Sequence, residues 1–198
     1  MSILLKTEAT LRERLRRETR SLHECLDARV SCFDVRDPAG LARFLSLHMA
    51  AFDRMARPDP DAGLAAAMTD LRARALTDLE ALGYAAPRSP AGAPGRYHPV
   101  AMSYVVAGSR LGGTVLRKRW LAATDPAVRC ARVYFDAPDY LDLWRAFCDT
   151  AGRTLAEGPD ADRVVDDARR VFEMYIDLAE RELEGVPAEN ARPRSQAG

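Results

Sequence analysis

Apolar residues recur every three or four positions along most of the chain, which is the spacing of one face of an α-helix. The clearest case is the segment from about Leu11 to Val30. Thr10 and Glu13 at its start have the capping-box spacing, in which each side chain satisfies a backbone N–H of the other. The apolar stripe of this segment falls within about 100° on a helical wheel. It consists of Leu11, Leu15, Leu22, Leu26 and Val30.

The same spacing predicts five further helices, over residues 37–57, 63–82, 100–123, 138–155 and 160–183. Asp37-Pro38 is a typical start, because aspartate caps the first turn and proline suits the first helical position. Gly83 is a typical stop. The second helix is expected to turn inward Leu41, Phe44, Leu45, His48, Phe52 and Met55. The last helix is expected to bury Val164, Val165, Ala168, Phe172, Tyr175, Ile176 and Ala179.

No segment alternates apolar and polar residues as a β-strand does, and we find no internal repeat. The sequence therefore predicts an all-α fold with six to eight helices. Residues 1–186 are expected to form one domain, because neither side of the proline-containing loop at 84–99 has a complete core of its own. Residues 187–198 are polar and are expected to be a disordered tail.

Composition narrows the range of partners. Lysines plus arginines equal aspartates plus glutamates, so the formal net charge is zero and a broad nucleic-acid-binding surface is not expected. No apolar run approaches the roughly 20 residues that span a bilayer, and Met1 to Lys6 is too short for the apolar part of a signal peptide. We therefore expect a cytoplasmic protein with no membrane partner. The four cysteines lack paired spacing and are expected to be spectator thiols.

One edge of the first predicted helix carries charged residues and a histidine beside the leucine stripe: Arg12, Arg16, Arg20, His23 and Asp27. A haem site needs such a set of residues. The ring needs an apolar slot, the iron needs an imidazole ligand, and the propionates need cations beside them. An ordinary solvated helix face would have the same residues. His48, on the apolar stripe of the second helix, is the rival imidazole, although its position there favours a core histidine over an iron ligand. No Glu-x-x-His or His-Glu-x-x-His spacing is present, which argues against a multi-histidine or di-iron site.

Three glycines, Gly108, Gly112 and Gly113, interrupt the helix predicted over residues 100–123. Each costs about 1 kcal/mol relative to alanine inside a helix, so a compensating reason is expected. One reason is a kink against a neighbouring helix. Another is the close approach of backbone to a flat ligand, which a Cβ atom would block. A phosphate-binding loop is not favoured, because the run lacks the terminal Lys-Ser/Thr.

Three segments together resemble the haem oxygenase family, over roughly residues 10–185. Thr19-Arg20-Ser21-Leu22-His23-Glu24-Cys25-Leu26-Asp27 resembles its proximal helix. Gly108-Ser109-Arg110-Leu111-Gly112-Gly113, preceded by Tyr104-Val105-Val106, resembles the bacterial form of its distal-helix motif. Residues 164–172 resemble its C-terminal core helix. Each motif alone is weak, and their order and spacing give the combination its specificity.

The resemblance implies a haem b between a proximal helix and a glycine-kinked distal helix, with His23 as the axial iron ligand. It implies that Arg16, Arg20 and Arg145 lie near the propionates and that Asp27 lies near the proximal ligand. It also implies that Gly108, Gly112 and Gly113 approach the ring and that Gly108 and Ser109 hold water for proton transfer.

The activity that the resemblance implies is reductive cleavage of haem by O2 to biliverdin, carbon monoxide and ferrous iron. Haem is then both cofactor and substrate, and a ferredoxin or reductase supplies electrons, since the chain has no flavin or nicotinamide fingerprint. The bacterial form of the motif also resembles enzymes that supply biliverdin to a phytochrome, which is therefore the expected acceptor. Many relatives have an acidic residue where this chain has Ala107 or Ser109, which puts catalysis in question more than haem binding. The alternatives are a haem-binding or haem-sensing protein without catalysis and, more remotely, a thiaminase-like hydrolase.

Overall fold

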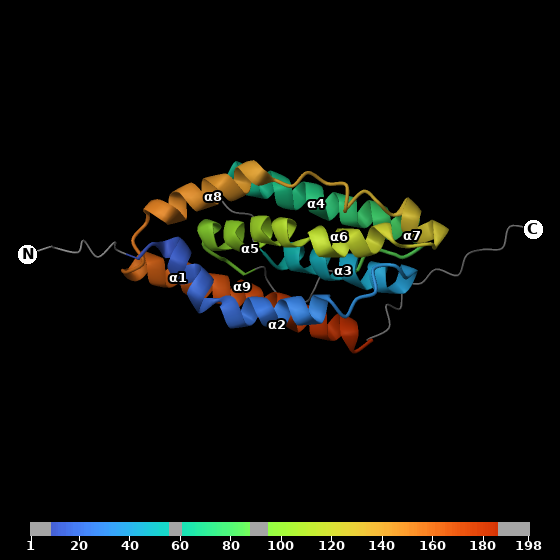
Figure 1. Cartoon of the computed structure of the whole chain (residues 1–198), viewed down its shortest axis with the longest axis horizontal. Helices are drawn as coiled ribbons and strands as arrows, with labels where there is room; N and C mark the ends of the chain where they lie inside the picture. Colours follow the sequence, from blue (N-terminus) through green and yellow to red (C-terminus); the bar gives the residue numbers. More distant parts are fainter. Residues whose placement is uncertain (1–8, 56–60, 88–94, 186–198) are drawn as a thin grey trace, which may run out of the picture.

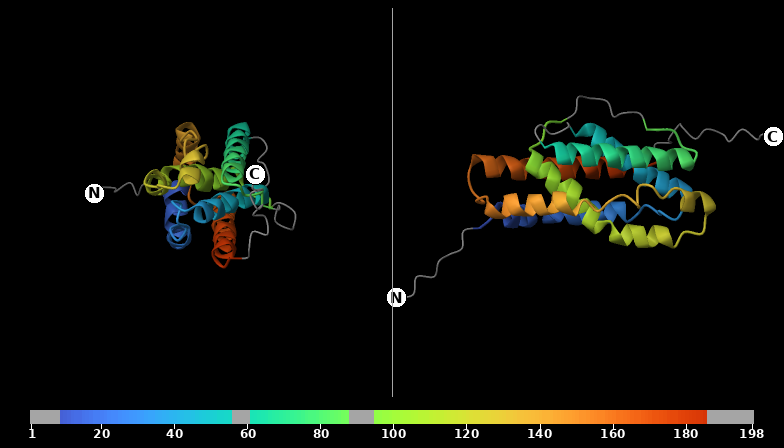
Figure 2. Two further views of the ribbon diagram at one scale, coloured as in Figure 1. Left: turned by 90° about the vertical axis from the view of Figure 1, so that its right-hand side faces the viewer. Right: turned by 90° about the horizontal axis from the view of Figure 1, so that it is seen from above.

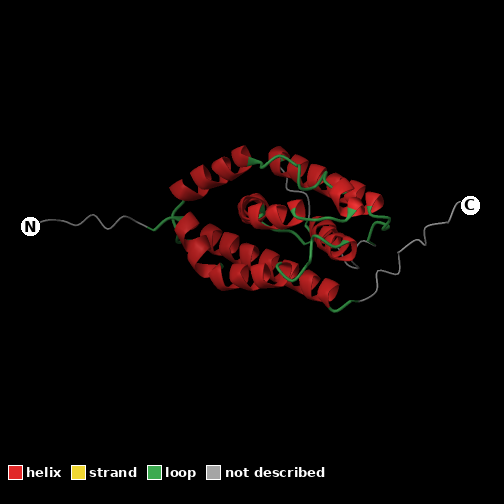
Figure 3. Ribbon diagram, turned by 45° about the vertical axis from the view of Figure 1, so that its right-hand side comes forward, coloured by secondary structure: helices red, strands yellow, loops and turns green. Residues whose placement is uncertain are grey.

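The structure, a computed structural model, describes residues 9–55, 61–87 and 95–185. Within these ranges it has eight helices of eight or more residues, one five-residue helix and no β-strand (Figures 1 and 3). They are α1 (Leu11–Glu18), α2 (Arg20–Val30), α3 (Pro38–Arg54), α4 (Ala62–Ala81), α5 (Pro99–Gly112), α6 (Thr114–Leu121), α7 (Pro126–Cys130), α8 (Leu141–Arg153) and α9 (Pro159–Leu183). The all-α prediction is confirmed, and the expected number of helices holds for the longer ones. The predicted tail at 187–198 lies outside the described residues.

The longest helix, α9, packs against α2, α3 and α5. Further contacts join α3 to α4, and α8 to both α1 and α5. In Figure 1, α4 and α8 form an upper layer and α1, α2 and α9 a lower one, with α3, α5 and α6 between them. The end-on view in Figure 2 shows the same layers along the bundle axis. This order places α5 and α6 across from α2. The segment that contains His23 therefore faces the segment that contains the three glycines.

Local sequence signals set several helix ends as predicted. The Thr10 side chain accepts a hydrogen bond from the Glu13 backbone N–H, and the Glu13 carboxylate accepts one from the Thr10 N–H at 2.9 Å. Asp37 caps α3 by accepting from the Gly40 N–H. Gly83 follows α4 with a φ of +82°, a left-handed conformation that glycine adopts without strain.

The first predicted helix is divided, which corrects the expectation of one continuous helix to Val30. The break is at Thr19, which lies between α1 and α2 and is fully buried. Its hydroxyl donates a hydrogen bond of 2.8 Å to the Leu15 carbonyl oxygen, one turn back. A threonine hydroxyl bonded in this way competes with the helix backbone and bends the chain.

Other boundaries also differ from the prediction. The helix predicted over residues 100–123 is divided at Gly113, whereas Gly108 and Gly112 remain inside α5. The helix predicted from Pro138 begins at Leu141, because Tyr140 before it has a left-handed φ of 52°. The short α7 was not predicted, although an Asp-Pro start precedes it in the sequence.

The core matches the predicted apolar faces of α3 and α9, whereas Leu22, Leu26 and Val30 of α2 are only partly buried. All seven residues expected to face inward on the last helix are buried, as are those on α3 apart from the partly exposed His48. Buried Asp78 on α4 accepts hydrogen bonds from the backbone N–H groups of Val133 and Tyr134, at 2.9 and 2.8 Å. Burial raises the pKa of this carboxyl group. Asp78 therefore fixes the irregular segment after α7, which has no helix of its own to hold it in place.

Every helix in the described ranges is too short or too polar to cross a lipid bilayer. The four cysteines are free thiols. Two of them, Cys25 and Cys148, are half-buried, and the other two are exposed.

Candidate functional site

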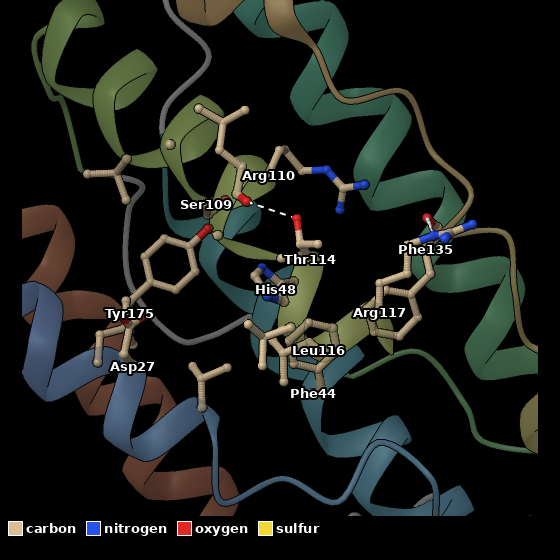
Figure 4. Close-up of a pocket in the computed structure, with 18 of the residues that line it drawn as sticks. Asp27, Phe44, His48, Ser109, Arg110, Thr114, Leu116, Arg117, Phe135 and Tyr175 are labelled. Atoms are coloured by element: carbon tan, nitrogen blue, oxygen red, sulfur yellow. Dashed lines mark hydrogen bonds between the residues drawn. The ribbon is translucent and has the colours of Figure 1, made fainter. Parts of the chain in front are cut away.

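A cavity of about 890 Å³ opens between α2 on one side and α5 and α6 on the other. A volume of this size is typical of sites for small molecules and cofactors. Six of the residues singled out in the sequence line it, namely His23, Asp27, Gly108, Ser109, Gly112 and Gly113. The inner wall is formed by α3, α9 and the segment after α7, which contribute Phe44, His48, Tyr134, Phe135, Phe172 and Tyr175. Figure 4 shows part of this lining. The fold thus brings together segments that are about 85 residues apart in the sequence.

His23 is well placed to offer a nitrogen to the cavity. Its side chain is 55% exposed, and its Nδ1 lies 3.3 Å from Oδ2 of Asp27, one turn further along α2. On the inner side the ring meets Phe172 of α9 edge-on, with 5.8 Å between ring centroids. A carboxylate beside Nδ1 favours the proton on that nitrogen, which leaves Nε2 as the free ligand atom.

The glycines of α5 divide between the two explanations that the sequence left open. At Gly113, which joins α5 to α6 with a helical φ of −63°, a Cβ atom would lie 3.3 Å from the Arg110 carbonyl oxygen, so a side chain there would require this turn to shift slightly. Outside its own turn of helix, a Cβ atom at Gly112 would meet no described atom within 4 Å, and one at Gly108 would meet Trp144 at 3.5 Å. Packing against the described residues therefore does not explain Gly108 and Gly112, whose backbone lines the cavity.

The start of the glycine segment has no acidic side chain. Ala107 is buried, and the Ser109 hydroxyl donates a 2.8 Å hydrogen bond to the Val106 carbonyl oxygen. The acidic residues that do line the cavity are Asp27, Asp136 and Asp139. Asp136 accepts hydrogen bonds from Arg117 and Arg132, and these lower its pKa.

The arginines expected near the propionates are not among the lining residues. Arg20 is bonded to Glu24 at 2.8 Å, Arg145 is bonded to Asp142 at 3.1 Å, and Arg16 is exposed on α1. Instead, Arg110 and Arg117 line the cavity. Sequence reasoning missed both as site residues, although Arg110 lies inside the glycine motif itself.

His48 was weighed as a core histidine and as a rival ligand, and the structure places it on the inner cavity wall. Its ring lies among Phe44, Phe52, Tyr134 and Tyr175, with centroid distances from 4.6 to 6.1 Å. Its Nδ1 is buried and has no hydrogen-bond partner among the described residues. Burial, helped by the charge of Arg110, lowers the pKa of His48 to about 3, so this imidazole is neutral at physiological pH.

No protein-family model matches the sequence, and neither a curated protein nor a solved structure is similar to it. The described residues also contain no cluster of three or more His, Cys, Asp or Glu side chains that would hold a bare metal ion. A haem iron differs from a bare ion in needing a single protein ligand on one face.

Proposed function

We propose that the cavity binds haem, that His23 is the axial iron ligand, and that the protein is a haem oxygenase. The observation that carries the proposal is that His23 of α2 and the glycine segment of α5 line one cavity of about 890 Å³. Gly112, which is exposed and lines this cavity, leaves room for a Cβ atom that no described residue outside its own helical turn fills. A flat ring lying against the α5 backbone accounts for that glycine, and the volume and aromatic lining of the cavity fit an apolar ring.

Each lining residue has a definite part in this proposal. Asp27 orients the His23 imidazole and keeps its proton on Nδ1, so that Nε2 faces the ligand. Gly108 and Gly112 allow the α5 backbone to approach the ring. The aromatic residues of α3 and α9 exclude water from the inner part of the cavity. Bound haem would supply an iron centre that activates O2, with electrons from an external donor such as a ferredoxin or reductase.

The proposed reaction is the reductive, oxygen-dependent conversion of haem to biliverdin, carbon monoxide and ferrous iron. The ring is then attacked while it is held against α5, so the position of the ring in the cavity decides which bridge carbon is lost. Closely packed walls are needed for a single product, because a ring that rotates about the iron–imidazole axis would present several bridge carbons.

The second candidate is a protein that binds haem without cleaving it. One observation favours it: no acidic side chain stands at positions 107 or 109, and the Ser109 hydroxyl is already bonded to the helix backbone. Proton delivery beside Gly108 would therefore depend on water or on groups from other elements.

One experiment tests both candidates. The purified protein is mixed with ferric haem, and the Soret band is followed during titration. A reductant system is then added under air, and biliverdin absorbance and carbon monoxide release are followed. A Soret shift with biliverdin supports the oxygenase, and a Soret shift without biliverdin supports the haem-binding protein. If no Soret shift occurs at micromolar protein concentrations, both proposals are wrong.

A further inference from the structure

Arg110 and Asp139 are the charged residues of the cavity lining that form no ion pair with a described residue, and Asp139 accepts a hydrogen bond from the Leu141 backbone N–H instead. Arg117 pairs with Asp136, and His23 lies beside Asp27. The guanidinium carbon of Arg110 lies 5.2 Å from the ring centroid of Tyr134, and its NH2 group reaches the Tyr134 carbonyl oxygen at 3.5 Å. Its Nε is buried and has no hydrogen-bond partner among the described residues.

No described carboxylate is bonded to this cation. Asp70 on α4 is close enough for Arg110 to contribute to the lowering of its pKa, but its carboxylate is engaged by Arg74 at 2.7 Å and by the Tyr140 hydroxyl. An arginine has five N–H donors, so Arg110 keeps unused hydrogen-bonding capacity beside an apolar cavity. A partly buried guanidinium without a counter-ion is costly, and a bound anion would remove that cost.

His48 completes the polar part of the inner wall. Its ring lies 5.4 Å from the ring of Tyr134, centroid to centroid, and Arg110 lies over the same Tyr134 ring. A neutral imidazole can donate one hydrogen bond without bringing a second positive charge to the site. Tyr175, whose ring packs against His48, lines the same wall. Figure 4 shows His48 and Arg110 on the sides of the cavity formed by α3 and α5.

We propose that Arg110 and His48 form an anion-binding site in the inner wall of the cavity. The site rests on the proposed function for its biological ligand, since the anion is either a carboxylate of the tetrapyrrole or a separate small anion beside the ring. In both cases an oxygen or nitrogen atom with negative charge accepts hydrogen bonds from Arg110, and Tyr134 holds the guanidinium in place. The assignment differs from the sequence expectation, in which Arg16, Arg20 and Arg145 bind the propionates.

The first test uses the protein without haem, so its outcome does not depend on the proposed function. Thermal unfolding is measured in increasing sodium formate and, at the same concentrations, in sodium chloride. Formate should raise the unfolding midpoint of the wild-type protein more than chloride does, because a ligand that binds only the folded state stabilises it. In Arg110→Met the apparent affinity for formate should fall roughly tenfold or more, which corresponds to about 1.4 kcal/mol.

Arg117→Met is the matched control, because Arg117 lines the same cavity but is already paired with Asp136. This variant should retain the formate effect of the wild-type protein. Arg110→Met is also expected to fold, since the change removes a buried N–H group that has no acceptor. A formate effect of equal size in the wild-type protein and in Arg110→Met would overturn the proposal, as would the absence of any formate effect in the wild-type protein.

The second test identifies the source of the anion. Metal-free protoporphyrin and its dimethyl ester, which has no carboxylate, are titrated into each variant by fluorescence. If a ring carboxylate occupies the site, Arg110→Met should weaken protoporphyrin binding roughly tenfold and leave ester binding unchanged. If a separate small anion occupies it, both porphyrins should bind as before, and azide affinity of the haem-loaded protein should fall instead. If the wild-type protein binds neither porphyrin, the cavity does not hold a tetrapyrrole without iron, and the formate result still decides the anion site.

Discussion

The Thr19 hydroxyl lies 3.2 Å from the Tyr104 hydroxyl, and this contact joins the break between α1 and α2 to the middle of α5. Tyr104 lines the cavity one turn before Gly108, and Thr19 lies one turn before His23. The same threonine hydroxyl donates to the Leu15 carbonyl oxygen. One buried contact therefore sets the spacing between the helix that carries His23 and the helix that carries the glycines.

Thr19→Val, which keeps the side-chain shape, should lower the free energy of unfolding by about 1–3 kcal/mol, because it leaves the Tyr104 hydroxyl without its partner, whereas the Leu15 carbonyl oxygen still accepts from the backbone N–H of residue 19. Tyr104→Phe should cost about 0.5–1.5 kcal/mol. Urea denaturation of both variants and of the double mutant measures the effect. Because the two hydroxyls share one contact, the double mutant should lose less than the sum of the single losses. Fully additive losses would contradict a direct contact.

Thr19 also illustrates which features of the fold could not be predicted from the sequence. Helix ends at Thr10, Asp37 and Gly83 could be predicted, because capping depends on residues within one turn. The division at Thr19 could not be predicted, because it depends on burial against a tyrosine 85 positions away. The irregular segment at Val133 depends on Asp78, 55 positions before it, and is equally invisible in local patterns.

The candidate site divides in the same way. His23 and the glycines stand in recognisable local motifs, and the structure places them around one cavity. Helical periodicity put His48 on an inward face of α3 but could not show that the face borders a cavity. Arg16, Arg20 and Arg145 were assigned by the resemblance, which compares positions in a motif and does not show the partner of a side chain. Arg20 and Arg145 are engaged by acids of their own helices.

His23→Ala should abolish the histidine-ligated Soret spectrum of the haem-loaded protein. The His23 ring is half exposed, so the free energy of unfolding without haem should change by less than about 0.5 kcal/mol. Absorption spectroscopy with matched urea denaturation separates the two effects. His48→Leu is the control and should keep the ligation spectrum, since the proposed ligand is intact. If His48→Leu loses the spectrum and His23→Ala keeps it, the wrong imidazole has been assigned to the iron.

Gly112→Ala should separate stability from ligand binding. Alanine favours a helix over glycine by about 0.5–1 kcal/mol, and outside its own turn of helix the new Cβ atom would meet no described atom within 4 Å. The free protein should therefore become slightly more stable, whereas haem affinity and biliverdin formation should fall because the Cβ atom occupies the space proposed for the ring. Gly112→Leu should reduce haem affinity and biliverdin formation further.

Gly152, which is exposed on α8 and also has open space at its Cβ position, provides the control variant Gly152→Ala. Unchanged haem binding in both Gly112 variants would falsify the proposed contact of α5 with the ring.

His48 should make the folded protein sensitive to acid. Burial lowers its pKa from 6.5 in the unfolded chain to about 3 in the folded one, so between these values the unfolded chain binds a proton that the folded protein does not. Stability from this group is complete above pH 6.5 and falls on acidification by up to about 1.4 kcal/mol per pH unit. Between pH 6.5 and 5 the loss should be about 2 kcal/mol.

Urea denaturation of His48→Leu at pH 7 and pH 5 should show that this part of the acid sensitivity has disappeared. The variant should lose no stability at pH 7, because leucine removes a buried nitrogen without a partner. His23→Ala, which lacks an exposed histidine instead, should keep the acid sensitivity of the wild-type protein. Parallel pH dependences in the wild-type protein and in His48→Leu would show that the buried imidazole does not control stability in acid.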